Sequence, residues 1–573
     1  MKYSILCDSY EVLESIPSKL SKADILAKLF SETHSNELPK IVLLAQGMVF
    51  PKFSGNEPGV AIQIMMKAIS KTTGFTQQEV ENKFKKTGDL GLTVEQFIKN
   101  RKQSTLSKKM LTIDNIFNNI QQLSFMSGHG SQDRKLNLIA ELLVSASPKE
   151  AKYIVRTILE ELRVGVGEGI IRDAIVKAFL VSENTTKEEK NEITKIVENA
   201  WCIFSDFGQV AKIAKEDGIQ GLKRVKIQIG NPVQVMLGEK AESIKEVFDK
   251  FEKLTVEFKY DGMRAQIHKK NKDIWIFTRR LENVTKQFPD LVELCKRSLM
   301  VDECIIEGEV LGIDPKTKLP LTFQKLSQRI HRKYYIEQIS EKIPIQMNVF
   351  DVLYVDGKMI LDKEFKERRN ILKGIIKEIP DKFKIASQII TNDIKEAEIF
   401  YKKSLKEGQE GVFLKVPSSK YVFGRRVDGW YKIKPNVETL DLVIIGATWG
   451  TGKRVGVIGS YILGCRDEET GDFLECGMLG SGVKEKENEK EHTTLKDLTK
   501  LLKPYIVSDR GVEIKIKPKI IISVDYQEIQ KSSNYKSGFA LRFPRFVSLR
   551  NDKGLNDVDT LDRINKLYRV QKK

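Results

Sequence analysis

Apolar residues recur at helical spacing through the first third of the chain. The segments "KADILAKLF", "RKLNLIAELLV" and "EAKYIVRTILEELRVG" place apolar side chains three and four residues apart. This spacing is the period of one face of an α-helix. The pattern predicts that residues 1–222 form an all-α domain.

The pattern changes near "KRVKIQIGNPVQVML", where a Gly-Asn-Pro breaker precedes β-branched and aromatic runs such as "LTVEFKY" and "IIEGEVLG". Such runs are typical of strands. A second, α+β domain is therefore predicted for residues 223–436. After "WYKIKPN", short apolar runs separated by glycines, such as "IGSYILGCRD", predict a C-terminal β-barrel of the oligonucleotide-binding (OB) type over residues 437–573, with a helix near "DTLDRINKLY".

Composition and charge narrow the functional class. A chain of 573 residues with 41% hydrophobic and 30% charged residues is a folded protein of several domains. Its net charge of +18 suits a polyanion such as nucleic acid. The six cysteines are scattered without CxxC spacing, which argues against structural zinc and disulfides. No apolar run of membrane-spanning length occurs, so we expect a cytoplasmic protein without a membrane partner.

The segment "EFKYDGMR", residues 257–264, contains a candidate nucleophile. An amine attacks phosphorus only when it is deprotonated, and the reference lysine pKa of about 10.4 makes that form rare at neutral pH. Strand alternation would put Glu257, Lys259 and Asp261 on one face, with a carboxylate on each side of the amine. Taken alone, the segment fits a surface lysine with ordinary carboxylate neighbours equally well.

Further motifs follow this segment in a fixed order. They are "IFTRRLENV", "IIEGEVLG", "MNVFDVLYVDG", "EGVFLKVP" and "GRRVDGWYKIKP". Together with "EFKYDGMR" they resemble the nucleotidyltransferase motifs of the covalent ligase and capping-enzyme superfamily. The whole chain resembles the ATP-dependent DNA ligases of archaeal and eukaryotic replicative type.

This resemblance implies a role for each motif residue. Lys259 would be the residue that carries AMP, with Glu257 at the adenine side and Phe350 stacked on the base. Glu309 and Glu410 would hold Mg²⁺, which prefers oxygen ligands. The remaining nucleotide contacts would be Arg264, Arg279, Arg426, Lys432 and Lys434, and we expect the charges of Lys432 and Lys434 to depress the pKa of Lys259.

Structural explanations compete with some of these roles. By composition alone, Phe350 on an apolar strand is a core residue, and Glu309 could be a solvated carboxylate. We interpret Glu282 as a positioning residue, and Asp261 as an organiser of the nucleophile. Only the order of the motifs favours the functional interpretation.

The C-terminal segment "ALRFPRFVSLRNDKG" matches the family's last motif, whose basic residues turn onto the triphosphate. Arg550, Asp552 and Lys553 fit its pattern, with a hinge after "WYKIKPN". "WGTGKR" is not a phosphate-binding loop, because Ala447 replaces its first glycine and Arg454 replaces its Ser/Thr. We interpret Lys453 and Arg454 as contacts to DNA or between domains.

The helical domain resembles the family's DNA-binding domain. Glycines at 165, 167 and 169 precede an apolar helix, and a helical segment rather than a strand comes before them, which argues against a dinucleotide site. Candidate phosphate contacts are Arg163, Arg172, Arg134 and Lys135, and ordinary surface charge explains each equally well. Archaeal relatives carry a glutamine and paired aromatics that dock on the sliding clamp; here "RKQSTLSKKM" retains Gln103 with Leu106 as the only apolar anchor.

The sequence therefore predicts an ATP- and Mg²⁺-dependent enzyme that seals nicks in double-stranded DNA during replication, repair and recombination. Its mechanism would use a lysine–AMP intermediate, and the family default is a monomer. An RNA ligase or GTP-using capping enzyme shares Lys-x-Asp-Gly but lacks a helical extension of this length. A nucleic-acid-binding scaffold with an inactive core is a further alternative, against which the intact motif residues argue. Donors other than ATP, the preferred metal and the source organism stay open, although the length is typical of archaeal members, for which the nucleoid is the expected location.

Overall fold

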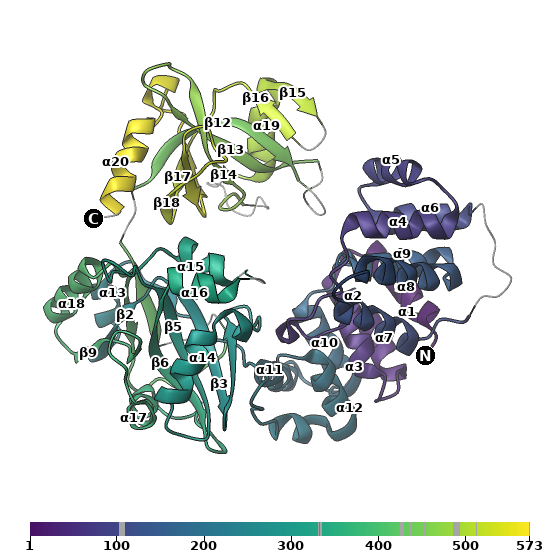
Figure 1. Cartoon of the computed structure of the whole chain (residues 1–573), viewed down its shortest axis with the longest axis horizontal. Coiled ribbons are helices and arrows are strands. Elements are labelled where there is room, and N and C mark those ends of the chain that lie inside the picture. Colours follow the sequence, from purple (N-terminus) through teal and green to yellow (C-terminus); the bar gives the residue numbers. More distant parts are fainter. Residues whose placement is uncertain are drawn as a thin grey trace. The chain divides into compact units, whose positions relative to one another are not determined.

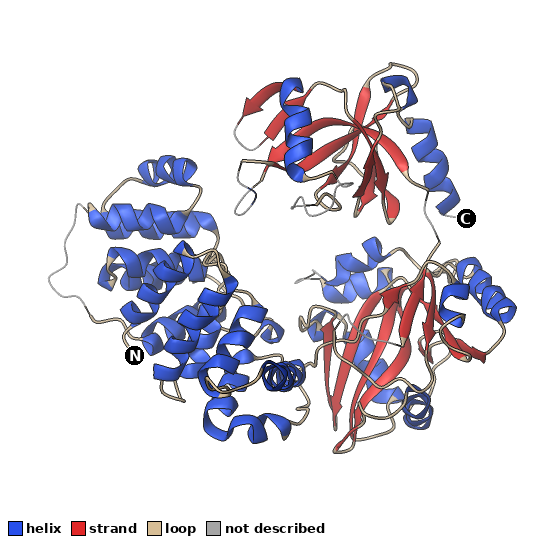
Figure 2. Ribbon diagram, turned by 180° about the vertical axis from the view of Figure 1, so that it is seen from behind, coloured by secondary structure: helices blue, strands red, loops and turns tan. Residues whose placement is uncertain are grey.

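A computed structural model provides the fold of the chain (Figure 1). It describes residues 1–573 except 102–108, 331, 333–334, 425–428, 436–437, 451–453, 455, 485–492, 511–512 and 572–573. Two compact units emerge, Met1–Lys434 and Pro435–Lys573. The first contains both the helical region and a pair of β-sheets, and the second is rich in strands (Figure 2).

The helical region confirms the prediction made from apolar spacing. Its helices are α1 Tyr3–Ser15, α2 Lys19–Glu32, α3 Leu38–Ala45, α4 Ile62–Thr73, α5 Gln77–Thr87, α6 Leu90–Lys99, α7 Ile113–Phe125, α8 Ser131–Ser145, α9 Pro148–Ile158, α10 Glu168–Phe179, α11 Lys187–Phe204 and α12 Phe207–Lys223. On α1, Tyr3, Leu6, Tyr10 and Leu13 are fully buried, because residues at this spacing share one helix face. Side-chain caps begin several helices, as in the capping box of Ser147 with Glu150 at α9.

Two sheets follow in the first unit. Their strands are β1 Glu239–Lys240, β2 Leu254–Lys259, β3 Met263–Lys270, β4 Asp273–Thr278, β5 Glu303–Gly312, β6 Ile345–Val355, β7 Lys358–Met359, β8 Phe383–Ile385, β9 Gln388–Thr391, β10 Gly411–Lys415 and β11 Trp430–Ile433. One sheet has the order β1-β11-β10-β2-β9, and the other has the order β4-β3-β5-β6-β7 with β8 beside β6. Helices accompany them: α13 Ile244–Phe248, α14 Pro289–Ser298, α15 Phe323–Ile330, α16 Ile336–Lys342, α17 Phe365–Ile375 and α18 Ile394–Lys406.

The chain passes from one sheet to the other directly after Lys259. Gly262 lies in this crossing, and a Cβ there would lie 2.3 Å from the carbonyl oxygen of Val310 on β5. Gly411, which begins β10, has φ +141°, and a Cβ there would lie 2.2 Å from the carbonyl oxygen of Ile433. Glycine is needed at both positions because backbone approaches backbone closely.

The second unit is built on a curved sheet. Its elements are β12 Leu440–Trp449, β13 Ile458–Arg466, β14 Phe473–Leu479, α19 Leu495–Leu502, β15 Ile506–Arg510, β16 Glu513–Ile516, β17 Ile521–Asp525, β18 Glu528–Lys531, β19 Phe539–Arg542, β20 Arg545–Leu549 and α20 Leu561–Gln571. The long strand β12 pairs with β17 through its first half and with β16 through its second. An isolated bridge, Ser481 to Arg545, links the segment after β14 to β20. Among the described strands, no full ladder closes this sheet into a barrel.

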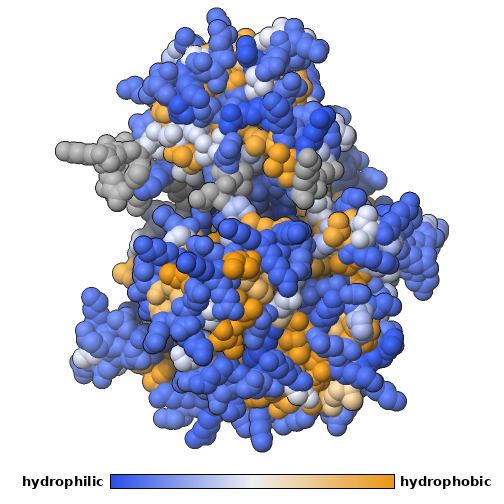
Figure 3. Space-filling view, turned by 90° about the vertical axis from the view of Figure 1, so that its left-hand side faces the viewer, coloured by the Kyte–Doolittle hydropathy of each residue, from blue (hydrophilic) through white to orange (hydrophobic). Residues whose placement is uncertain are grey.

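The face shown in Figure 3 is predominantly polar. In the view of Figure 3 hydrophilic side chains cover most of the visible face, with hydrophobic side chains in smaller groups between them. None of the helices in the described ranges combines the length and the apolar character that crossing a bilayer requires.

Candidate active site

Lys259 lies at one end of the five-stranded sheet, where β2 and β11 end and β10 between them begins. It ends β2 opposite Gly411 of β10, and its ammonium group donates a hydrogen bond to the carboxylate of Glu410. Lys434, directly after β11, donates to the other oxygen of the same carboxylate. Because β10 runs antiparallel to both β2 and β11, the start of β10 lies beside the ends of these two strands. Residues more than 150 positions apart thus form one charged cluster.

This arrangement differs from the alternation expected for the motif. Strand β2 ends at Lys259, so Asp261 lies in the crossing to β3 rather than on the same strand face. The carboxylate that contacts the amine belongs to Glu410, and Glu257 has other partners. Sequence alternation describes only residues on one strand, whereas Glu410 lies directly before the neighbouring strand β10 and reaches Lys259 from there.

The environment of Lys259 lowers its pKa. Burial is the largest cause, because it disfavours the charged amine, and the charge of Arg279 adds to the lowering of the pKa. The carboxylates of Glu309 and Asp261 oppose it. We expected the charges of Lys432 and Lys434 to supply this effect, but burial dominates and Lys434 contacts Glu410 instead.

Glu309 lies on the other sheet, close enough to influence the nucleophile. On β5 it stands opposite Arg264 of β3 and Asn348 of β6. Burial raises the pKa of Glu309 to about 7, although the charges of Lys259 and Arg264 oppose that rise. The carboxyl group therefore gains and loses a proton near neutral pH, which argues against a simple solvated carboxylate.

Arg264 is held by a buried polar network. Its Nη2 donates to Glu307 at 2.7 Å, and its Nη1 donates to the carbonyl oxygen of Met236 at 2.6 Å. The hydroxyl of Tyr421 donates to the same oxygen of Glu307 at 2.8 Å. Glu307 and Tyr421 were not among the predicted site residues. Glu307 could have been found as the first carboxylate of "EGE", but nothing in the sequence indicates Tyr421.

Glu257 accepts hydrogen bonds from two cations. Arg369 Nη1 lies 2.9 Å from one carboxylate oxygen, and the ammonium group of Lys415 contacts the other. The three side chains are at most 4% exposed. Burial lowers the pKa of Lys415, and the charge of Glu257 opposes this lowering of the pKa. Arg369 was not among the predicted site residues. It reaches the site from α17, 112 residues away from Glu257.

Phe350 lies in an aromatic cluster beside these residues. Its ring is 9% exposed and packs edge-on against Trp430, with centroids 6.2 Å apart. The ammonium nitrogen of Lys415 lies 4.9 Å from the Phe350 centroid, and the guanidinium carbon of Arg264 lies 5.3 Å from it. Phe350 therefore packs in the core and also lies between two charged groups of the site.

The other predicted residues of the core lie around this centre. Arg279 is exposed just after β4. Glu282 closes the following turn, where its backbone N–H and its carboxylate both contact the hydroxyl of Thr278. Lys432 stands on β11 opposite Phe413. Arg426 lies outside the described residues.

The predicted motif near the C-terminus forms an ion-pair cluster in the second unit. Arg550 and Lys553 both contact Asp441 of β12, at 2.7 Å and 2.6 Å. Arg550 also pairs with Asp552 at 2.7 Å. Arg454 follows β12 and is partly exposed. Lys453 lies outside the described residues.

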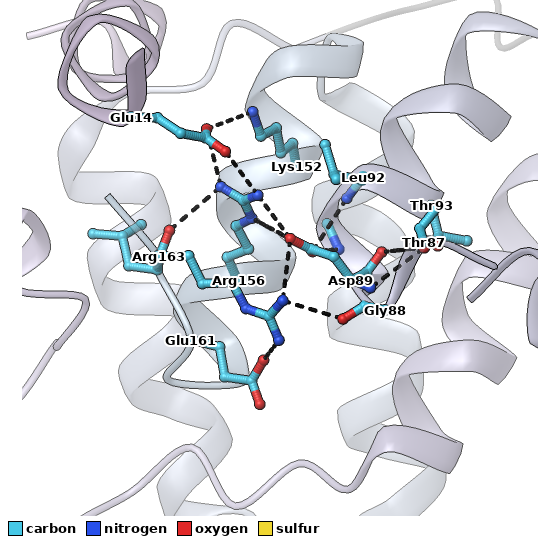
Figure 4. Close-up of polar contacts among 12 residues, drawn as sticks. Glu14, Thr87, Gly88, Asp89, Leu92, Thr93, Lys152, Arg156, Glu161 and Arg163 are labelled. Carbon is cyan, nitrogen blue, oxygen red and sulfur yellow. Dashed lines mark hydrogen bonds and ion pairs between the residues drawn. The ribbon is translucent and has the colours of Figure 1, made fainter. Parts of the chain in front are cut away.

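Arg163, a candidate phosphate contact in the helical region, stands at the edge of a second ion-pair cluster (Figure 4). Its guanidinium group pairs with Glu161, lies 3.7 Å from Asp89, and donates to the carbonyl oxygen of Gly88 at 3.1 Å. At the centre, Arg156 joins Asp89 at 2.7 Å to Glu14 at 3.1 Å. The structure thus gives Arg163 partners within the chain.

The other candidate phosphate contacts also have partners. Arg172 pairs with Asp173 at 2.8 Å. Lys135 donates to the carbonyl oxygens of Pro58 and Gly59, and Arg134 donates to those of Ser127 and His129. Helix α9 and a loop precede α10, which agrees with the argument against a dinucleotide site. Gln103 and Leu106 lie outside the described residues.

Comparison with known proteins identifies three matching family models. Residues 2–176 match the model described as DNA ligase N terminus, residues 235–434 match the ATP dependent DNA ligase domain, and residues 454–553 match the ATP dependent DNA ligase C terminal region. These ranges correspond to the helical region, the two-sheet core and the strand-rich unit.

Several archaeal proteins are similar over their whole length. A DNA ligase of Nanoarchaeum equitans is 44% identical over 573 residues, which is 100% of this chain and 99% of that protein. DNA ligases of Thermococcus onnurineus and Archaeoglobus fulgidus are 43% and 39% identical, again with 100% and 99% of the two chains covered. A solved structure described as "Pmar-Lig_PreS3" shares the fold at a TM-score of 0.55 and 15% identity, covering 95% of this chain and 99% of its own. The resemblance predicted from the motifs is confirmed, and the chain belongs to the ATP-dependent DNA ligase family.

Proposed function

We propose that this protein seals nicks in duplex DNA with Lys259 as the residue that carries AMP. Membership of its family makes it an enzyme that forms phosphodiester bonds at the expense of ATP. The observation that supports Lys259 is its place: a largely buried amine, 15% exposed, with a lowered pKa, joined to Glu410 where β2 ends. A lowered pKa increases the share of neutral amine, which is the form that attacks phosphorus.

The reaction proceeds through two covalent intermediates. The neutral amine of Lys259 attacks the α-phosphorus of ATP, an N–P bond forms, and the bond to the β-phosphate breaks to release pyrophosphate. The 5′-phosphate at the nick then attacks the adenylyl phosphorus, which breaks the N–P bond and returns the amine. Finally the 3′-hydroxyl attacks the 5′-phosphorus, which joins the strands and releases AMP.

The nucleotide would occupy the site between the two sheets. Phe350 would stack on the adenine, with Glu257 at its edge, and Arg264 would contact the ribose or phosphate. The other proposed nucleotide contacts are Arg279, Glu309, Arg426, Lys432 and Lys434. The support for Arg264, Glu309 and Arg279 is their neighbourhood: Arg264 and Lys415 lie near the Phe350 ring, and Glu309 and Arg279 act on the pKa of Lys259.

Glu309 and Glu410 fit a magnesium ion. Among the described residues no group of three or more metal-binding side chains occurs, but Mg²⁺ is commonly held by one or two carboxylates together with substrate phosphates. Both carboxylates act on Lys259, one through its charge and one by direct contact. A bound ion would neutralise negative charge on the triphosphate, and it would displace the ammonium groups from Glu410.

The remaining parts would hold DNA and complete the site. Candidate phosphate contacts are Arg163, Arg172, Lys135, Lys453 and Arg454, supported by the net charge of +18. We propose that the second unit is an OB-type barrel. One long strand, β12, pairs with β17 and then with β16 along its length, and the bridge from Ser481 to Arg545 joins the segment after β14 to β20. Its Arg550, Asp552 and Lys553 would approach the triphosphate.

We propose further that the enzyme works inside the cell as a monomer. All six cysteines are free thiols in the structure, which suits a reducing compartment. Docking on a sliding clamp near Gln103 stays disfavoured by the sequence, because the paired aromatics are absent from "RKQSTLSKKM".

The test is transfer of label from α-labelled ATP to the protein, followed on a denaturing gel. The protein is first treated with pyrophosphate to reverse any adenylation carried over from expression. We expect label on the wild type and on Lys269→Met, which removes a buried lysine of β3 that donates to the carbonyl oxygen of Leu299. Lys259→Met should carry no label. An unlabelled wild type, or an equally labelled Lys259→Met, would refute the assignment.

A second measurement separates this enzyme from an RNA ligase. Labelled wild-type protein is given matched duplexes with a nick in a DNA strand or in an RNA strand. We expect joined DNA and released AMP. Joining of RNA alone would favour the alternative, and labelling without joining of either would reject nick sealing.

A further inference from the structure

Glu257 is held in place from two sides by positive charge. Arg369 of α17 donates to one carboxylate oxygen at 2.9 Å, and Lys415 of β10 contacts the other. Arg369 is itself fixed, because it donates to the carbonyl oxygens of Phe350, at 3.3 Å, and Ala386. The carboxylate can neither rotate away nor exchange partners without breaking a buried ion pair.

The surroundings of Lys415 are aromatic. Its nitrogen lies 4.0 Å from the ring centroid of Trp430, 4.7 Å from that of Phe365 and 4.9 Å from that of Phe350. The side chain is 1% exposed. Lys415 therefore interacts with Glu257 rather than with solvent. The rings attract its ammonium group but give it no hydrogen bond.

Arg369 and Lys415 each form an ion pair with one oxygen of Glu257, so the carboxylate accepts from both sides. Among the described residues no further donor contacts either oxygen, and a carboxylate oxygen has a second lone pair that can accept. The free positions can receive an amino group, whereas a carbonyl oxygen placed there would face negative charge.

We propose that Lys415 and Arg369 are positioning residues that hold Glu257 as a fixed acceptor and so make the enzyme select a 6-amino purine over a 6-oxo purine. This inference rests on the proposed function, in which Glu257 faces the edge of the base. Adenine offers its 6-amino group as a donor to the carboxylate. Hypoxanthine has an oxygen at that position and is otherwise close to adenine in size, so inosine triphosphate is the appropriate probe.

The measurement is the rate of label transfer from α-labelled ATP and from α-labelled inosine triphosphate to the pyrophosphate-treated protein. The ratio of the two rates at low nucleotide concentration reports discrimination. The wild type should prefer ATP by about a hundredfold or more, because a site built around one hydrogen bond strongly rejects a partner that cannot make it. Lys402→Met, which removes an exposed lysine of α18, should leave the ratio unchanged.

The variants act on the acceptor in different ways. Lys415→Met keeps the length of the side chain but removes the cation that holds one oxygen of Glu257, so the carboxylate can turn and no longer presents a fixed acceptor to the base. We expect the ratio to fall at least tenfold. Glu257→Gln places an amide at the same point, which can donate or accept, and should bring the ratio close to one.

A purely structural role for Lys415 predicts a different result. It would slow both nucleotides equally and leave the ratio at its wild-type value, which would overturn the inference. If Lys415→Met does not fold, Glu257→Gln decides: an unchanged ratio in that variant also overturns it. Failure of the wild type to take up label from either nucleotide would instead reject the proposed function itself.

Discussion

Replacement of Arg156 by methionine should destabilise the helical region strongly and locally. Arg156 is 3% exposed and joins two carboxylates, Asp89 at 2.7 Å and Glu14 at 3.1 Å (Figure 4). Methionine keeps the apolar stem against Gly91 of α6, where the arginine side chain packs closely, and removes only the guanidinium group. Asp89 then becomes a buried charge that has lost its main partner.

The structure sets the size of this effect. Removal of one member of a buried ion pair costs about 3–5 kcal/mol. The lower end applies here, because Asp89 keeps hydrogen bonds from the backbone N–H groups of Gly91 and Leu92, and Arg163 lies 3.7 Å away. We therefore expect a loss of about 3 kcal/mol, which corresponds to roughly a hundredfold increase in the opening of α6 and α9.

Native-state amide hydrogen exchange measures this opening, because it reports local free energies in a chain of several units. The matched control is Arg172→Met, which removes an exposed pair and should cost less than about 1 kcal/mol. The double variant Arg156→Met, Asp89→Asn should be more stable than Arg156→Met alone, since the unpaired charge is gone and asparagine still caps α6. Exchange no faster than in Arg172→Met, or a double variant worse than the single, would refute the reasoning.

Two further predictions concern the site. Burial raises the pKa of Glu309 to about 7, so protons compete with Mg²⁺ for this carboxylate below that pH. The concentration of Mg²⁺ needed for labelling of Lys259 should therefore fall as pH rises and level off near 7. A Mg²⁺ requirement that is flat from pH 5 to 8 would contradict this. Gly262→Ala puts a Cβ 2.3 Å from the Val310 carbonyl oxygen, which must displace the crossing directly after Lys259 and should slow labelling about a hundredfold. Gly374→Ala on α17 meets nothing within 4 Å and should label at the wild-type rate, so equal rates in the two variants would disprove the explanation.

Local features of this protein can be predicted from its sequence alone. The spacing of Ala23, Leu26, Ala27 and Phe30 in "KADILAKLF" predicts α2 because helix formation and burial follow the same period. The apolar run before Lys259 predicts β2, and the order of the motifs led to the right family. These inferences succeed because each depends on neighbours in the chain or on residue types at fixed spacing.

Only the tertiary structure could supply the partners of the charged groups. Glu410 and Arg369 come from positions 151 and 112 residues away from the side chains they contact. No pattern in the sequence indicates that Arg369 rather than the neighbouring Arg368 points to Glu257, since Arg368 pairs with Asp351. Strand alternation predicted carboxylates beside Lys259 from its own strand, whereas the contact comes from Glu410, directly before the neighbouring strand β10.

The difference between the features that the sequence predicts and those that only the folded chain supplies has a physical reason. Sequence by itself determined the elements, the candidate nucleophile and the chemical types available around it, because periodicity and residue chemistry are local properties. The sheet order and the close approach at Gly262 decided which charges meet and how deeply each is buried. A pKa depends on that burial and on those distances, so the lowered pKa of Lys259 exists only in the folded chain, as do the two ion pairs that hold Glu257.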